Sequence, residues 1–225
     1  MNWFITLFSS TLGKKLIMAL TGLFLISFLV VHLAGNFQLL HSDDGRAFNI
    51  YAYFMTHNPV IKTISYLLYT SILVHALWGL LLSIKNRRSR GPQGYSKKNA
   101  SSPWTSRNMG ILGTLIFIFI VIHMQQFWAQ MHWGDIDIVT YDGVEYKNLY
   151  ITVAQAFAEA WYVALYVISM AALAFHLWHG FASAFQTLGL NHLKYNAVIK
   201  FVGSAFAIIV PALFAWIPIQ MFFLQ

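Results

Sequence analysis

Five histidines lie within long apolar stretches of the sequence: His32, His75, His123, His176 and His179. Ionisable side chains inside a membrane are costly and usually mark a functional site, and the neutral imidazole ring is a common metal ligand. A single such histidine would as often be a packing residue hydrogen-bonded to a neighbouring helix. Because these histidines occupy four separate stretches, we interpret them as ligands.

The composition places these histidines in a membrane. Of 225 residues, 58% are hydrophobic and only 9% are charged, whereas about a quarter of a soluble domain is charged. A spanning helix needs about 20 mostly apolar residues. We therefore predict an all-α membrane protein, a single domain over 1–225, with five transmembrane helices at about 14–40, 60–84, 108–131, 154–187 and 198–222.

The basic residues predict the orientation of these helices. With a cytoplasmic N-terminus, eleven of the fourteen basic residues fall on the cytoplasmic side, as the positive-inside rule requires. These are Lys14, Lys15, Lys85, Arg87, Arg88, Arg90, Lys97, Lys98, Arg107, Lys194 and Lys200. Topology and contact with anionic membrane lipid thus explain the net charge of +7, and no nucleic-acid partner is predicted.

The depth of each histidine follows from the helical rise of about 1.5 Å per residue. His32 and His123 lie about 24 Å and 22 Å from the cytoplasmic ends of their spans, at an outer level. His75 lies about 15 Å from that side, and His176 and His179 about 18 Å and 14 Å, at an inner level. Counting leaves the choice between His176 and His179 open.

Glycines near the histidines favour a flat ligand. Gly79 and Gly180 each follow a histidine by four residues on the same helical face, and Gly22 and Gly113 each precede one by ten. Two histidines at one depth suit the axial positions of a haem, whereas zinc would need three or four converging ligands. The absence of cysteine excludes covalent haem attachment and iron–sulfur ligation. We expect two non-covalent haems b within a bundle of the first four helices.

Several segments, in this order and spacing, resemble the cytochrome b subunit of succinate dehydrogenase/fumarate reductase in its single-chain, five-helix, dihaem bacterial form. The similarity covers nearly the whole chain. It is carried by Gly13 to Gly22, His32-Leu-Ala-Gly-Asn36, Phe48 to Met55, Asn58-Pro59, His75-Ala-Leu-Trp-Gly79 and His176-Leu-Trp-His-Gly180.

The resemblance implies one haem ligand from each of four helices. These are His32 and His123 at the outer haem and His75 and His176 at the inner haem, so His176 is preferred over His179. It also implies a flavoprotein and an iron–sulfur subunit docked on the cytoplasmic face. Electrons would pass from the iron–sulfur subunit through both haems to menaquinone, and this chain would perform no dicarboxylate chemistry itself. The expected location is the bacterial inner membrane, as part of respiratory complex II, which could form a higher oligomer.

Two further groups of residues are candidates for contacts with quinone or with haem propionates. Between the first two spans, on the predicted outer side, five residues offer polar groups to a quinone: His41, Asn49, Tyr53, His57 and Asn58. On the inner side, the long cationic side chain of Lys85 could reach a propionate, as could those of Arg87, Arg88 and Lys194. His179, one turn from His176, could contact a propionate or a neighbouring helix.

Two other functions remain open from the sequence. The first keeps the haems and changes the partner, as in the cytochrome b of a hydrogenase or formate dehydrogenase, although the motif order argues against it. The second is a proton-coupled transporter that uses its membrane histidines and would favour broken helices.

Overall fold

The computed structural model describes residues 3–89, 91 and 104–223. Within these residues, five helical segments are long and apolar enough to cross a membrane: Thr11–Leu40, Pro59–Ser89, Met109–Trp133, Ala160–Thr187 and Asn196–Phe223. The prediction of a helical, multi-pass membrane protein is confirmed. Arg90, Lys97 and Lys98, which contributed to the predicted orientation, lie outside the described residues.

The helices and strands of the described residues follow one another along the chain from α1 to α10. They are α1 (Trp3–Ser9), α2 (Thr11–Asn36), the 3-10 turn η1 (Phe37–Leu40), α3 (Arg46–His57), α4 (Pro59–Ser89), α5 (Trp104–Arg107), α6 (Met109–His123), the π-helical segment η2 (Met124–Ala129), α7 (Gln130–Trp133), β1 (Ile138–Tyr141), β2 (Val144–Lys147), α8 (Leu149–Phe157), α9 (Ala160–Thr187) and α10 (Asn196–Phe223).

These elements form two compact units. Unit 1 comprises Met1–Ser27, Leu68–Ile116 and Ala172–Ile208, and unit 2 comprises Phe28–Leu67, Phe117–Ala171 and Ile209–Gln225. Each of the five long helices α2, α4, α6, α9 and α10 contributes residues to both units. His75, His176 and His179 belong to unit 1, and His32 and His123 belong to unit 2. Each expected haem site therefore draws its ligands from one unit.

In unit 1, small residues allow long helices to pack closely. A Cβ atom at Gly110 of α6 would overlap with the Ser83 side chain of α4. At Gly203 of α10 it would lie 2.6 Å from the ring of Phe181 on α9. Small residues are common where membrane helices meet, because they let the backbones approach.

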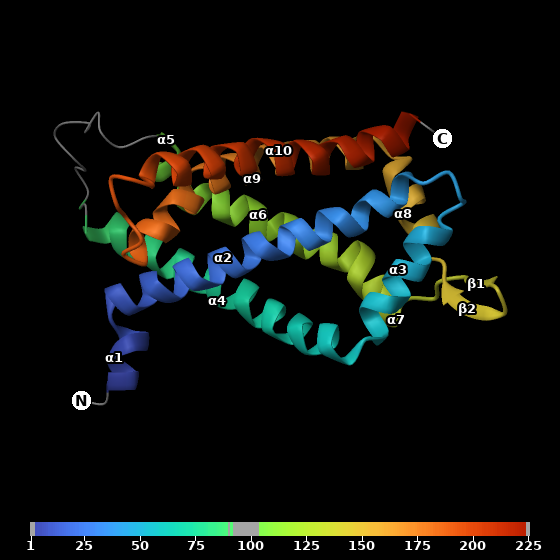
Figure 1. Ribbon diagram of the computed structural model, residues 1–225, viewed down its shortest axis with the longest axis horizontal. Coiled ribbons are helices and arrows are strands. Elements are labelled where there is room, and N and C mark those ends of the chain that lie inside the picture. Colours follow the sequence, from blue (N-terminus) through green and yellow to red (C-terminus); the bar gives the residue numbers. More distant parts are fainter. Residues whose placement is uncertain (1–2, 90, 92–103, 224–225) are drawn as a thin grey trace. The chain divides into compact units, whose positions relative to one another are not determined.

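In unit 2, the segments between spans fold into a layer made of α3, the hairpin β1–β2 and α8, which we call the α3–α8 layer. Helix α3 contacts both α8 and β2, and Figure 1 shows the yellow hairpin beside the cyan helix α3. The strands pair antiparallel, with Tyr141 opposite Val144. Asp142 and Gly143 both have positive φ, 51° and 79°, which is the conformation of a type I′ hairpin turn.

Two helix boundaries follow from local chemistry or from packing. Asn58 caps α4, because its side-chain oxygen accepts hydrogen bonds from the Val60 and Ile61 amides, and Pro59 occupies the first helical position, where proline is favoured. Helix α9 begins at Ala160 rather than near 154, because the apolar stretch breaks at Ala158–Glu159 and its first part becomes α8. The sequence has no glycine or proline at this break, and α8 packs against α3.

Candidate paired-histidine sites

In unit 1, the rings of His75 on α4 and His176 on α9 meet. Their centroids lie 6.2 Å apart, with an angle of 68° between the ring planes. Of the two histidines that residue counting left open, His176 is the one whose ring contact with His75 is found among the described residues. Its role as a ligand stays a prediction.

In unit 2, the rings of His32 on α2 and His123 at the end of α6 form the second pair. Their centroids lie 5.8 Å apart and the rings are nearly perpendicular, at 88°. Four phenylalanine rings surround the pair, and the π-helical segment η2 begins directly after His123. The phenylalanines are Phe28 and Phe214 beside His32, and Phe119 and Phe127 beside His123. Such π-helical turns are rare and often occur at functional sites.

Both centroid separations fit one metal atom held between two rings. An imidazole nitrogen binds a metal at about 2.0–2.1 Å and lies roughly 1.2 Å from its ring centroid, so two rings on opposite sides of one metal have centroids about 6 to 6.5 Å apart. The observed 6.2 Å and 5.8 Å lie at or near this range. Each pair could therefore supply two ligands to one metal.

The two glycines that follow the histidines of the His75–His176 pair have few side-chain atoms against them among the described residues. A Cβ atom at Gly79 would meet only the tip of Met18, at 3.8 Å, and one at Gly180 only the tip of Met109, at 4.0 Å. These glycines lie four residues after His75 and His176, on the same helical faces. All four paired histidines are only partly covered by the described protein. The donor set, the spacing and the glycine faces therefore fit a bis-histidine haem.

The two sites are built from a repeated pattern. On α2, Met18, Gly22 and His32 are spaced by four and ten residues, and Met109, Gly113 and His123 have the same spacing on α6. Gly22 lies against His75, with 3.2 Å from its would-be Cβ to Cε1, and Gly113 lies against His176 at 3.7 Å. The methionines are the part of the pattern that sequence reasoning missed, although their spacing is visible in the sequence.

The hydrogen-bond partners of the ring nitrogens differ within each pair. His75 Nδ1 lies 3.2 Å from the Thr21 hydroxyl, and His123 Nδ1 lies 2.8 Å from the Tyr166 hydroxyl. Among the described residues, no group bonds the buried His176 Nδ1, and no hydrogen bond to the His32 ring is found. Neither Thr21 nor Tyr166 was a candidate from the sequence, because only the fold brings them to the histidines.

Of the predicted quinone residues, Asn49 forms hydrogen bonds within the α3–α8 layer. Its side chain is 1% exposed. Its amide nitrogen donates to the Tyr141 hydroxyl at 3.2 Å and to Asn148 Oδ1 at 3.0 Å, while its oxygen accepts from the Tyr150 backbone amide at 2.9 Å. Both amide hydrogens are used, so Asn49 has none to offer a quinone.

The other residues of this region are more open. Tyr53 and His57 stack on α3 with ring centroids 3.9 Å apart, and both are exposed. His57 Nδ1 donates to the Tyr53 carbonyl at 2.8 Å, since a carbonyl can only accept, which leaves Nε2 as an acceptor. His41 is exposed after η1. Nearby, burial against Gly35 raises the pKa of the Tyr51 phenol above its ordinary value.

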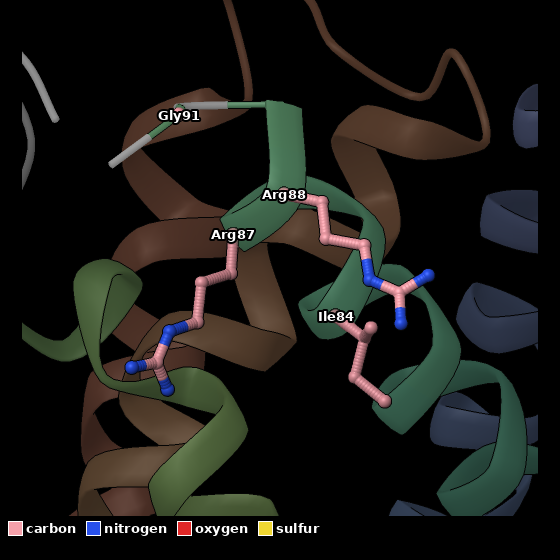
Figure 2. Close-up of a pocket in the computed structure, with 4 residues that line it drawn as sticks. All are labelled: Ile84, Arg87, Arg88 and Gly91. Atoms are coloured by element: carbon pink, nitrogen blue, oxygen red, sulfur yellow. The ribbon is translucent and has the colours of Figure 1, made fainter. Parts of the chain in front are cut away.

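Of the predicted propionate partners, Lys85, Arg87 and Arg88 lie at or near the C-terminal end of α4, and Lys194 is exposed in the turn between α9 and α10. Lys85 Nζ donates to the Thr11 hydroxyl at 2.7 Å. Arg87 and Arg88 line an open pocket of about 490 Å³ together with Ile84 and Gly91, and Figure 2 shows their guanidinium groups pointing away from one another. Cations at this end of a helix are favoured by its dipole. His179 is only partly exposed, on the same helix as His176.

Comparison of the chain with known protein families, with curated proteins and with solved structures finds no match.

Proposed function

We propose that this chain is the membrane-anchoring cytochrome b subunit of a succinate:quinone oxidoreductase, with two bis-histidine haem sites. The observation that carries the proposal is the pairing of four membrane histidines into two sets, with ring centroids 5.8 Å and 6.2 Å apart. Each pair offers the two histidine side chains that a bis-histidine haem would need.

The roles of the chain follow from these pairs. His32 and His123 would hold one haem, and His75 and His176 would hold the other. Haem held by two histidines would supply outer-sphere electron transfer rather than oxygen chemistry. Phe28, Phe214 and the neighbouring phenylalanines place apolar rings against the His32–His123 pair, and such an apolar shell would limit the access of solvent to a bound haem.

The identity of the partners rests on the sequence resemblance. We propose a flavoprotein and an iron–sulfur subunit on the cytoplasmic face of a bacterial inner membrane, next to the basic ends of the spans, and menaquinone as electron acceptor. Tyr53 and His57 are the proposed quinone contacts, because their side chains are exposed side by side on α3. Asn49 is withdrawn as a quinone contact, because both hydrogens of its amide are engaged.

The test of the proposal is a haem count with a reduced-minus-oxidised spectrum of the purified chain. We expect two low-spin haems per chain. A colourless protein would exclude every haem-based function and leave the transporter alternative. If haem is present, reduction by succinate in the assembled complex separates the proposed function from a hydrogenase or formate dehydrogenase cytochrome, since those would require hydrogen or formate.

The glycine faces give a second, steric prediction. Gly180→Leu should remove the haem of the His75–His176 site and leave the other, because a leucine would occupy the helical face that follows His176. Gly180→Ala is the matched control: its Cβ would lie 4.0 Å from the flexible tip of Met109, an ordinary contact, so both haems should remain. Haem content per folded chain is the measurement, and two haems in Gly180→Leu would refute a macrocycle on this face.

A further inference from the structure

Each histidine pair is chemically asymmetric. One ring has a side-chain hydroxyl at Nδ1, which is Thr21 for His75 and Tyr166 for His123. The opposite ring has none: among the described residues, nothing bonds His176 Nδ1, and no hydrogen bond to the His32 ring is found. The two proposed haem sites thus share the arrangement of one partnered and one unpartnered histidine.

The repeated pattern of the helices shows why the second partner is missing. Leu112 precedes Gly113 on α6 as Thr21 precedes Gly22 on α2, so the position that would serve His176 carries no hydroxyl. The position that would serve His32 is found in the same way. Ser65 lies ten residues before His75 on α4, as Tyr166, the partner of His123, lies ten residues before His176 on α9. The Ser65 hydroxyl donates to the Ile61 carbonyl of its own helix instead.

The direction of the Thr21 hydrogen bond is determined by its other contact. The Thr21 hydroxyl has one hydrogen, and it donates to the Ile17 carbonyl at 2.8 Å. If His75 ligates a metal through Nε2, its Nδ1 carries the proton, and the Thr21 oxygen, 3.2 Å away, accepts it. The Nε2 lone pair of His75 is then free, as ligation of a metal through this atom requires.

Tyr166 makes the corresponding contact in a more enclosed setting. The residue is 7% exposed, and the rings of Phe119, Phe127 and Phe157 surround it. If His123 ligates through Nε2, its Nδ1 carries the proton, and the Tyr166 oxygen at 2.8 Å is the acceptor. Burial in an aromatic cluster lowers the local dielectric constant, which strengthens such a hydrogen bond.

We propose that Thr21 and Tyr166 are positioning residues that hold His75 and His123 in the ligating tautomer and lower the reduction potential of their respective sites. An acceptor at Nδ1 makes the imidazole a stronger electron donor and so stabilises the oxidised metal. This inference rests on the proposed function, because it presumes that both pairs hold haem. It adds that the two sites are tuned separately, by different hydroxyls on different helices.

The test is a redox titration of the holoprotein with Thr21→Val and Tyr166→Phe, each of which removes the hydroxyl and preserves the shape. Thr21→Val should raise the midpoint potential of the His75–His176 site alone, and Tyr166→Phe that of the His32–His123 site alone. A tenfold loss of preference for the oxidised form corresponds to about 59 mV for one electron. Loss of an outer-shell partner typically costs about 10- to 100-fold in metal affinity, so the shift should be easily resolved.

Matched controls separate this effect from packing. Ser169→Ala removes a buried hydroxyl about one turn from Tyr166 on α9, which donates to the Leu165 carbonyl of its own helix. Thr114→Val removes a hydroxyl that donates to a backbone carbonyl of its own helix. Both should leave the two potentials unchanged. If Tyr166→Phe fails to fold or loses haem, a ring-fluorinated tyrosine placed at 166 weakens the acceptor at nearly constant shape and should raise the same potential by less.

A gain-of-contact variant tests the same inference from the opposite side. Leu112→Thr should give His176 Nδ1 the acceptor that Thr21 provides for His75, and lower the potential of that site. Unchanged potentials in Thr21→Val and Tyr166→Phe, with two haems present, would overturn the inference and leave the proposed function standing. A chain without haem would overturn the proposed function and this inference together.

Discussion

Replacing His123 with leucine should leave a folded protein that retains one haem per chain. His123 and His32 face one another in unit 2, while the other pair lies in unit 1. Loss of one axial ligand should therefore release the haem of its own site without affecting the ligands of the other. Haem content and low-temperature spectra of the purified variant measure the result, and quinone reduction should be lost with the His32–His123 site.

The reciprocal variant and a control complete this experiment. His75→Leu should remove the haem of the His75–His176 site and keep that of the His32–His123 site. His132→Leu changes an exposed histidine whose ring bonds the Trp128 carbonyl within its own helix, so it should retain both haems. Loss of both haems from a folded His123→Leu protein would contradict the assignment of His32 and His123 to a site of their own.

The spanning helices were predictable because a bilayer requires long apolar segments, and the sequence contains five of them. Their ends were less predictable. The break at Ala158–Glu159 carries no glycine or proline, and arises where α8 turns to pack on α3. The π-helical segment after His123 likewise has no signature in its sequence, Met-Gln-Gln-Phe-Trp-Ala.

In the α3–α8 layer, one feature could have been predicted from the sequence and another could not. Asp142-Gly143 between Tyr141 and Val144 is a strong hairpin signal, and it predicts the turn that the structure contains. In contrast, the burial of Asn49 depends on Tyr141, Asn148 and Tyr150, which follow it by about 100 residues. As a polar residue between two predicted spans, Asn49 suggested a ligand contact, whereas its hydrogen bonds in the tertiary structure give it a structural role.

For the histidine sites, the sequence supplied the residues and the fold supplied their partners. Helical rise predicts which histidines share a depth, but residues one turn apart, such as His176 and His179, differ by only about 4.5 Å in rise. Their directions around the helix decide which one faces His75. The Thr21 and Tyr166 hydroxyls reach histidines on other helices, so no local spacing could have predicted these contacts.

The second large effect is expected at Asn49, where leucine should unfold the α3–α8 layer and leave the haem sites intact. The substitution removes three hydrogen bonds, and it leaves the Tyr150 amide without its acceptor in the first turn of α8. Each buried polar group left unsatisfied costs about 1–3 kcal/mol, so the layer should lose several times the stability of one ordinary hydrogen bond. Limited proteolysis of the hairpin at increasing temperature measures this loss.

Arg46→Ala is the matched control, because it also removes a link between α3 and the hairpin. The Arg46–Asp142 ion pair is exposed, with side chains 47% and 79% accessible, and such pairs contribute about 0–1 kcal/mol. In Arg46→Ala, cleavage of the hairpin should therefore begin at nearly the same temperature as in the unsubstituted protein. In Asn49→Leu, it should begin at a much lower temperature. An unchanged onset in Asn49→Leu, combined with loss of quinone reduction, would instead return Asn49 to the quinone site. A lower onset with two haems retained would establish it as the residue that joins α3, the hairpin and α8.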